Sequence, residues 1–248
     1  MIRRVENTGF ICAPYMKGFY FCGQEGKDLL YAEDSELTKQ CQHMPGQIQR
    51  SNKFGEMLYD IARTGPTNWL EVGTWNGLGS TQCILDGFIG RPEAKLTSLE
   101  IDPCMFAAAG ENLKNHPARA CVRFIHGKLW SNQPVPEFPT MFQLPVGELG
   151  SAHFYIHYER EKALYEEAYK FVPESAPDVV VLDGGEYSGY FDWLHVDKSA
   201  LKYVFLDDTH TFKNAKIVEE LTGDARWSCM ARGSDRNGWA VFCRVGAP

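Results

Sequence analysis

The sequence lacks several features that would assign it to common classes of protein. Its longest apolar runs fall far short of the roughly 18 residues that a membrane-spanning helix needs. The segment after Met1 has no apolar core of signal-peptide length. Lys and Arg number 25 against 32 Asp and Glu, and no basic stripe is visible, which disfavours a nucleic-acid surface. These absences predict a soluble cytoplasmic protein that binds neither membrane nor nucleic acid.

The eight cysteines form no C-x-x-C pair and are scattered along the chain. Disulfides persist mainly in oxidising compartments, so free, buried thiols are expected here. Internal repeats and low-complexity tracts are also absent from the sequence. Because 248 residues with 44% hydrophobic content can bury a large core without oligomerising, we expect one catalytic domain.

An apolar strand at 68–72 runs into a turn with three glycines and then into a helix. Gly73, Gly77 and Gly79 lack a Cβ, so they can adopt positive φ and allow a ligand close to the backbone. The start of the helix offers unpaired N–H groups. The spacing G-x-x-x-G-x-G differs from the G-x-G-x-x-G that places a pyrophosphate on a helix N-terminus. Glu71 would repel a diphosphate and suits a cationic or amine-bearing ligand.

A second predicted strand, at 95–100, also ends in a carboxylate. Enough chain separates Glu71 from Glu100 for one helix and a crossover back to a parallel neighbour. In nucleotide-binding α/β sheets, an acidic side chain at this place accepts hydrogen bonds from both ribose hydroxyls. We therefore predict that Glu100 binds a ribose, with Ile101 beside the adenine. The alternative for Glu100 is a solvated strand end.

This combination resembles the class I S-adenosylmethionine-dependent methyltransferases, whose first motif is an acidic residue followed by G-x-x-x-G-x-G. The resemblance implies S-adenosylmethionine as the cofactor, with its methionine portion over the loop and the junction 126–129 closing over the adenine. An ordinary strand-to-helix turn is the alternative. The predicted cofactor contacts are Glu71, Gly73, Thr74, Gly77, Gly79, Ser80, Glu100, Ile101, Lys128, Leu129 and Asp183.

Further apolar strands at 121–125, 178–183 and 203–208 alternate with helices, which favours a parallel sheet covered on both faces. The segments 227–231 and 239–244 are joined by a turn too short for a crossover helix, so they should pair antiparallel. The resemblance supplies the remaining topology. It implies a Rossmann-like α/β fold with a mostly parallel seven-stranded sheet, helices on both faces and an antiparallel last strand.

Two segments depart from this pattern. Residues 1–50 mix aromatic residues and glycine without a sustained period, so we expect a strand-and-loop extension that could also join copies of the chain in a homo-oligomer. The methyltransferase domain then spans 51–248, beginning with a helix at about 51–63. Within it, a proline-rich insertion at about 130–175 contains an aromatic-rich helix near 151–171. We expect this insertion to set substrate choice.

Three carboxylates follow two neighbouring strands of the predicted sheet. Asp183 closes the fourth strand, and Asp207 and Asp208 close the fifth. Because ligands of open α/β sheets bind outside the carboxyl ends of the strands, the three side chains should reach one cleft. Clustered carboxylates repel one another unless a cation or a raised pKa relieves them, and hard oxygen ligands suit Mg²⁺ or a similar divalent ion. The alternative is that Asp207 and Asp208 cap the next helix.

The carboxylate pattern resembles the metal-dependent small-molecule O-methyltransferases of the catechol and macrolide-sugar types, as does the Lys213-Asn214 pair that follows it. The resemblance implies methylation of a hydroxylated small molecule, with a metal ion that lowers the pKa of the hydroxyl. The lysine that serves the catechol type as general base after the strand-four Asp is absent. His210 and Glu186 are the remaining candidates, and His210 is favoured for its unperturbed pKa.

Two other functions share parts of the pattern. A nicotinamide dehydrogenase would have the strand, the turn and the acidic residue, but its fingerprint should be G-x-G-x-x-G and its cleft should not hold three carboxylates. A non-catalytic module could keep the fold and bind S-adenosylmethionine or a nucleoside without turnover. The sequence does not identify the methyl acceptor or decide between oxygen and nitrogen as the nucleophile.

Overall fold

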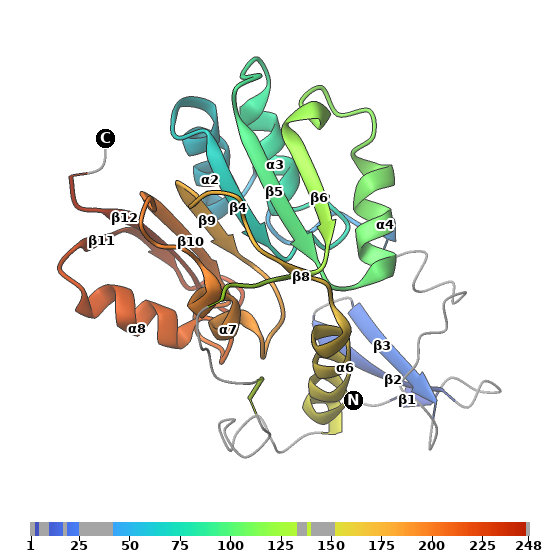
Figure 1. Ribbon diagram of the computed structural model, residues 1–248. Coiled ribbons are helices and arrows are strands. Elements are labelled where there is room, and N and C mark those ends of the chain that lie inside the picture. The colour runs from blue at the N-terminus through green and yellow to red at the C-terminus, as the bar shows by residue number, and fades with distance from the viewer. Residues whose placement is uncertain are drawn as a thin grey trace.

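The computed structural model is organised around one seven-stranded sheet (Figure 1). The described residues are 3–4, 10–16, 19–24, 42–132, 138–139 and 152–246, with the backbone alone described before residue 42 and at 152–157. The strands of the sheet are β4 (Asn68–Val72), β5 (Lys95–Glu100), β6 (Val122–His126), β9 (Val179–Leu182), β10 (Tyr203–Asp207), β11 (Trp227–Gly233) and β12 (Trp239–Arg244).

The strand order in the sheet is β11-β12-β10-β9-β4-β5-β6. All neighbours from β10 to β6 are parallel, whereas β12 runs antiparallel to both β10 and β11. The last strand is reversed because the connection from Gly233 to Trp239 is too short to cross over the sheet. The expected α/β class, the parallel sheet and its antiparallel last strand are therefore confirmed.

Helices cover both faces of the sheet and its carboxyl edge. They include α2 (Lys53–Thr64), α3 (Ser80–Phe88), α4 (Pro103–Asn112), α6 (Ala152–Glu167), α7 (Gly189–His195) and α8 (Ala215–Gly223). α2 and α3 pack on one face, α7 and α8 pack on the other, and α6 lies beside the carboxyl ends of the strands (Figure 1). Across the described helices, none combines the length and the apolar character needed to cross a membrane.

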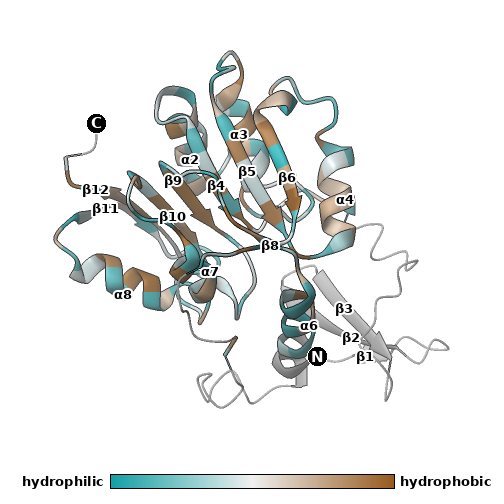
Figure 2. Ribbon diagram, in the orientation of Figure 1, coloured by the Kyte–Doolittle hydropathy of each residue, from teal (hydrophilic) through white to brown (hydrophobic). Residues whose placement is uncertain are grey.

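The side chains of the central strands alternate between two hydrophobic cores. In β9, Val179 and Val181 join the core under α2 and α3, whereas Val180 and Leu182 join the core under α7 and α8. Both faces of this strand are thus buried, which explains its unbroken apolar sequence (Figure 2). The two cores fix the sheet, and with it the positions at which the strands end.

Two smaller sheets accompany the main one. β1 (Arg3–Arg4), β2 (Phe10–Met16) and β3 (Phe19–Gln24) form an antiparallel sheet, and β7 (Lys128–Leu129) pairs in parallel with β8 (Lys170–Phe171). The domain boundary at residue 50 and the role of the insertion remain predictions. Large parts of both segments lie outside the described residues.

Candidate functional site

The glycine-rich turn after β4 is shaped by backbone angles that favour glycine. Gly73 and Gly77 have φ of 96° and 79°, and Trp75 between them has φ of 48°. The N–H of Gly73 donates to the carbonyl of Leu99 at 2.9 Å, which brings the turn over the end of β5. A Cβ at Gly73 would overlap the carbonyl oxygen of Asp183, so only glycine fits where the ends of β4 and β9 meet.

Glu71 lies beneath the turn. Its side chain is fully buried, and one carboxylate oxygen accepts hydrogen bonds from the hydroxyls of Thr81 at 2.7 Å and Ser98 at 2.6 Å. Burial raises the pKa of Glu71 to about 7, although these hydroxyls act in the opposite direction. Glu71 therefore joins β4, β5 and α3 below the turn through one carboxylate oxygen, and its contact with a cofactor stays a prediction.

Thr74 and Ser80 are also almost completely buried. The hydroxyl of Thr74 shares a hydrogen bond with the hydroxyl of Ser98, and Ser80 is the first residue of α3. Gly79 is the N-cap of α3 and provides no side chain to cap it. Gly79 packs closely against Gly46, and the buried side chains of Thr74 and Ser80 lie inside the turn.

The segment just before α2 holds the turn from the other side, and sequence reasoning missed it. The side chain of Asn76 is fully buried and donates to the carbonyl of Met44 at 2.7 Å. The carbonyl of Leu78 accepts from the N–H of Gly46 at 2.8 Å and from the side chain of Gln49 at 2.9 Å. No periodicity marks this segment, and the only signal available in the sequence was its nearness to the first helix.

Glu100 stands at the end of β5 directly against the turn. One carboxylate oxygen accepts the Trp75 N–H at 2.6 Å, and the other accepts the Asp102 N–H at 2.9 Å. Burial raises the pKa of Glu100, against the effect of these hydrogen bonds. Each oxygen keeps acceptor capacity for a further donor, such as a ribose hydroxyl. Ile101 follows Glu100 at the same edge and is partly buried.

The resemblance predicts that Lys128 and Leu129 contact the adenine, but both side chains are buried among other residues of the protein. The ammonium of Lys128 donates to the carbonyl of Tyr165 and lies 4.2 Å from the centre of the Tyr165 ring. Burial lowers the pKa of Lys128. Leu129 is fully buried in the core that also contains Leu99. Successive side chains of a strand point to opposite faces, so both faces of β7 are covered by protein at this point.

The three aspartates lie together, as predicted. Oxygen atoms of Asp183, Asp207 and Asp208 lie within 4.8 Å of one another where β9 and β10 end. Lys213 stands among them, with Nζ 2.9 Å from Oδ1 of Asp183 and 3.1 Å from Oδ2 of Asp208. Arg236 forms an ion pair with the remaining carboxylate, that of Asp207. Sequence reasoning assigned no role to either cation.

Backbone conformation and packing place Lys213 there. Asp208 has a φ of 51°, which is unusual outside glycine and redirects the chain at the end of β10. Asn214 is fully buried and donates to the carbonyls of Leu182 at 3.1 Å and Asp207 at 2.5 Å. Neither aspartate caps α8, whose N-cap is Asn214, so the capping alternative does not apply.

The electrostatics of the cluster differ from residue to residue: burial, with Asp183 beside it, raises the pKa of Asp207 to about 8, and burial also raises the pKa of Asp183, whereas Lys213 and Asp208 are held in their charged forms. Burial alone would lower the pKa of Lys213, but Asp183, Asp208 and Asp207 outweigh it and hold the pKa well above its ordinary value. Burial alone would raise the pKa of Asp208, but Lys213 prevails and holds it below its ordinary value. Lys213 is therefore an ammonium and Asp208 a carboxylate at neutral pH.

A divalent ion does not fit the cluster in this arrangement. The donor set is suitable, since three carboxylates are hard oxygen ligands. However, the ammonium of Lys213 lies within hydrogen-bond distance of two of them, and the guanidinium of Arg236 pairs with the third. A metal ion would have to share these oxygens with cations about 3 Å away, which Coulomb repulsion opposes.

The structure separates the two candidate general bases. Burial raises the pKa of Glu186 to about 7, while Lys213 and Thr211 act in the opposite direction. Glu186 therefore belongs to the charged cluster. His210, favoured from the sequence, is exposed, and its ring lies where a Cβ of Gly238 would be. Glu186 is partly buried and His210 is exposed, and the identity of the general base stays a prediction.

Aromatic side chains and Glu161 pack around the segment that follows Asp183. The Tyr187 ring is fully buried, with its centre 5.4 Å from that of Tyr158 and 6.4 Å from that of Phe212. Glu161 in α6 accepts the N–H groups of Tyr187 at 2.9 Å and Ser188 at 2.7 Å. These contacts attach the helix of the insertion to the chain that follows Asp183.

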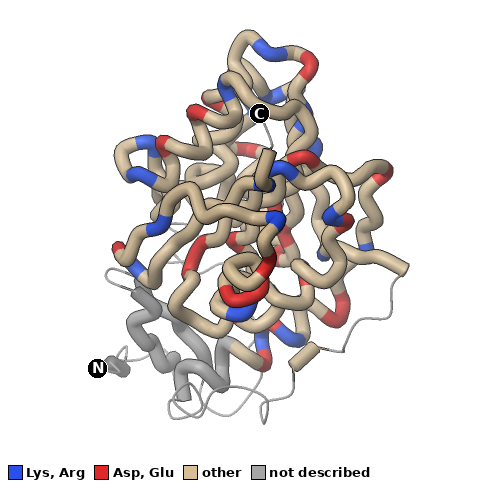
Figure 3. The backbone as a smooth tube through the Cα atoms, turned by 90° about the vertical axis from the view of Figure 1, so that its left-hand side faces the viewer, with Lys and Arg blue, Asp and Glu red and all other residues tan. Residues whose placement is uncertain are grey.

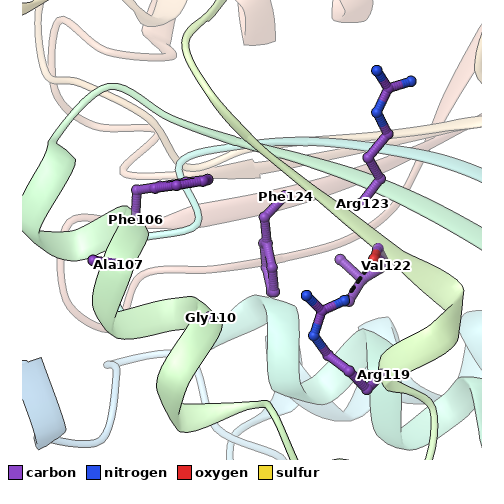
Figure 4. A pocket seen from close by; sticks show the side chains of 7 residues that line it. All are labelled: Phe106, Ala107, Gly110, Arg119, Val122, Arg123 and Phe124. Carbon is purple, nitrogen blue, oxygen red and sulfur yellow. Dashed lines mark hydrogen bonds between the residues drawn. The ribbon is translucent and has the colours of Figure 1, made fainter.

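A separate hollow of about 520 Å³ lies between α4 and the edge strand β6. Figure 4 shows Phe106 and Phe124 beside it, with Arg119 and Arg123 nearby. None of the residues predicted for the site lines this hollow. It is a surface feature of the sheet edge, distinct from the glycine-rich turn and the carboxylate cluster.

Comparisons with known proteins identify the fold. No protein-family model matches the chain, and no curated protein matches it. Similar solved structures include Rv0187 from MTB, solved with a bound cofactor, at 15% identity and a TM-score of 0.53, covering 84% of this chain and 86% of that chain. A putative O-methyltransferase from Klebsiella pneumoniae has 13% identity and a TM-score of 0.51, covering 84% and 86%.

A putative caffeoyl-CoA O-methyltransferase from Staphylococcus aureus has 14% identity and a TM-score of 0.50, covering 83% of this chain and 88% of that chain. At these identities the likeness concerns the fold. The chain therefore shares the Rossmann-like fold of these structures, which confirms the fold expected from its motifs.

Proposed function

We propose that this protein transfers a methyl group from S-adenosylmethionine to a hydroxyl group of a small molecule. The observation that carries the proposal is the carboxylate of Glu100, held against the glycine-rich turn by the Trp75 N–H at 2.6 Å. A ribose-binding carboxylate at this point of the sheet is what a nucleoside cofactor requires. The fold shared with structures named as O-methyltransferases supports the same assignment.

The residues at the ends of β4 and β5 suit the cofactor. Gly73, Gly77 and Gly79 would let its methionine portion approach the backbone, and Glu100 would accept hydrogen bonds from its ribose hydroxyls. Ile101 would lie beside the adenine. Glu71 supports this arrangement from below, because its carboxylate fixes the strands that carry the turn.

In this reaction the protein mainly has to align the cofactor with the acceptor and to remove one proton. Bound S-adenosylmethionine would supply the methyl group from its sulfonium, and sulfur would keep the electrons of the carbon–sulfur bond when the acceptor oxygen takes the methyl carbon. We assign the proton of the hydroxyl to Glu186, whose pKa of about 7 suits a general base at neutral pH. His210 is the second candidate. The buried ring of Tyr187 helps to exclude water.

The divalent ion expected from the sequence is not part of this proposal, because Lys213 and Arg236 already pair with the three aspartates. The cytoplasmic location and the homo-oligomer stay predictions. The absence of a nucleic-acid partner also stays a prediction, which the net charge of −7 supports. In Figure 3 acidic and basic residues are interspersed, without a stripe of basic residues in that view.

Titration calorimetry tests the proposal. We expect S-adenosylhomocysteine to bind and NAD to give no heat. Transfer of a labelled methyl from S-adenosylmethionine should then be detectable with a panel of phenols, sugars and hydroxylated peptides. Heat from NAD alone would favour a dehydrogenase, and cofactor binding without transfer to any acceptor would favour a non-catalytic binding module.

A further inference from the structure

Lys213 has the environment of a structural cation, which is unusual for a lysine. Its side chain is only 5% exposed, and its ammonium lies 2.9 Å from Asp183 and 3.1 Å from Asp208. These partners come from the ends of two neighbouring strands, β9 and β10, so the ammonium joins them at the place where ligands of such sheets bind. A cation bridging two carboxylates is the arrangement that a divalent ion would otherwise provide.

The backbone fixes Lys213 in this position. A Cβ at Gly189 would lie 2.8 Å from the carbonyl oxygen of Lys213 and 3.0 Å from its Cγ, so the close approach of α7 depends on glycine. The next residue, Asn214, is anchored to the ends of both strands through the carbonyls of Leu182 and Asp207. The backbone at Lys213 therefore cannot shift without breaking the buried contacts of its neighbour.

We propose that Lys213 is the built-in cation of this site and takes the place of a divalent ion, so that the protein works without metal. Catalysis without metal rests on the proposed methyl transfer, whereas Lys213 excludes a metal ion from the free protein as well. Arg236 supplies a second cation through its ion pair with Asp207.

Metal titration of the wild type and of Lys213→Ala tests the proposal. The wild type should bind no Mn²⁺ by calorimetry or by electron paramagnetic resonance at millimolar concentration. Lys213→Ala removes the cation and leaves three carboxylates together, so it should bind Mn²⁺ roughly tenfold or more tightly than the wild type. Stoichiometric Mn²⁺ binding to the wild type that Asp183→Asn abolishes would overturn the proposal.

Two control variants isolate the position of the charge. Lys216→Ala removes an exposed lysine whose ammonium lies over the ring of Tyr190, so it should gain no Mn²⁺ binding. Lys213→Arg keeps a cation in the cluster and should also gain none. If Lys213→Ala does not fold, the wild-type titration decides alone, because Mn²⁺ bound to Asp183 beside an intact Lys213 contradicts the proposal.

Failure of this inference and failure of the proposed function are distinguishable. Methyl transfer by the wild type should be unchanged in EDTA. Activity that EDTA abolishes and Mg²⁺ restores would overturn the role of Lys213 and leave the methyltransferase assignment intact. A wild type that binds neither S-adenosylhomocysteine nor Mn²⁺, while Lys213→Ala binds Mn²⁺, would overturn the proposed function and support the role of Lys213.

Discussion

The two halves of the candidate site are held in place by different physical means. The glycine-loop half comprises residues 73–80 and Glu100. Its geometry is set by backbone angles and by hydrogen bonds in which at most one partner is charged. In the carboxylate half, which comprises the three aspartates with Lys213 and Arg236, buried ion pairs set it. The first half follows local rules of the chain, whereas the second depends on which charges the fold brings together.

The largest expected effect concerns the ion pairs. Lys213→Met should lower the free energy of unfolding by about 3–5 kcal/mol, because it leaves buried carboxylates without their cation. Urea denaturation at neutral pH measures this loss of stability. Lys53→Met breaks an exposed pair with Glu56 and should change the stability by less than about 1 kcal/mol. Equal effects of both variants would mean that the carboxylate half is not held by charge.

Backbone geometry is tested by Gly73→Ala. The new methyl group would overlap the Asp183 carbonyl at a φ of 96°, so we expect a loss of about 3 kcal/mol in the free energy of unfolding. Gly90→Ala is the matched control, because Gly90 has a φ of 81° but open space around it. It should lose only the cost of the left-handed conformation, about 1–2 kcal/mol. The difference between the two variants measures the close approach alone.

The buried carboxyl group of Glu71 makes stability depend on pH. Burial raises its pKa from 4.5 to about 7, so between these values the folded protein holds a proton that the unfolded chain has lost. The contribution of Glu71 to stability therefore falls as the pH rises through this window. Relative to the wild type, the free energy of unfolding of Glu71→Gln should rise by on the order of 2–3 kcal/mol from pH 5 to pH 8. Urea denaturation at the two pH values measures this change.

A matched control for this pH dependence is Glu174→Gln, which changes an exposed carboxylate whose side chain is 88% accessible. Its stability relative to the wild type should be the same at both pH values. If Glu71→Gln also keeps a constant difference from the wild type, burial does not perturb Glu71 in the way its surroundings indicate.

The smallest expected effect concerns cofactor affinity. Glu100→Gln keeps one acceptor oxygen and loses the charge, so S-adenosylhomocysteine should bind about 1.5 kcal/mol less tightly, or roughly tenfold in Kd. Glu111→Gln, on the exposed side of the neighbouring α4, is the control and should leave the Kd unchanged. If calorimetry gives the same Kd for both variants, Glu100 does not bind the ribose.

Sequence reasoning succeeded where the determinants are local. Glycine spacing, apolar runs and the short connection before the last strand predicted the turn, the parallel strands and the reversed strand, and the structure has all of them. It also predicted that Glu100 and the turn share one edge of the sheet and that the three aspartates cluster. Parallel strands bring their carboxyl ends to the same edge whatever lies between them.

Side-chain direction was less predictable. Glu71 and Lys128 carry charge in the sequence and suggest ligand contacts, yet both are buried, because α3 covers Glu71 and α6 covers Lys128. His210 comes soon after the strand that carries Asp207 but is exposed over Gly238. Pairing between strands and the angles of single turn residues decide such orientations, and neither can be derived from spacing along the chain.

The sequence by itself determined the class of the sheet, the glycine-rich turn and the edge at which a ligand would bind, because periodicity and backbone freedom act over a few residues. Only the tertiary structure decided how the aspartates are neutralised. Lys213 and Arg236 reach them from a turn before α8 and from the connection between β11 and β12. Ion pairing depends on distance in space, which the fold sets and the order of residues alone does not.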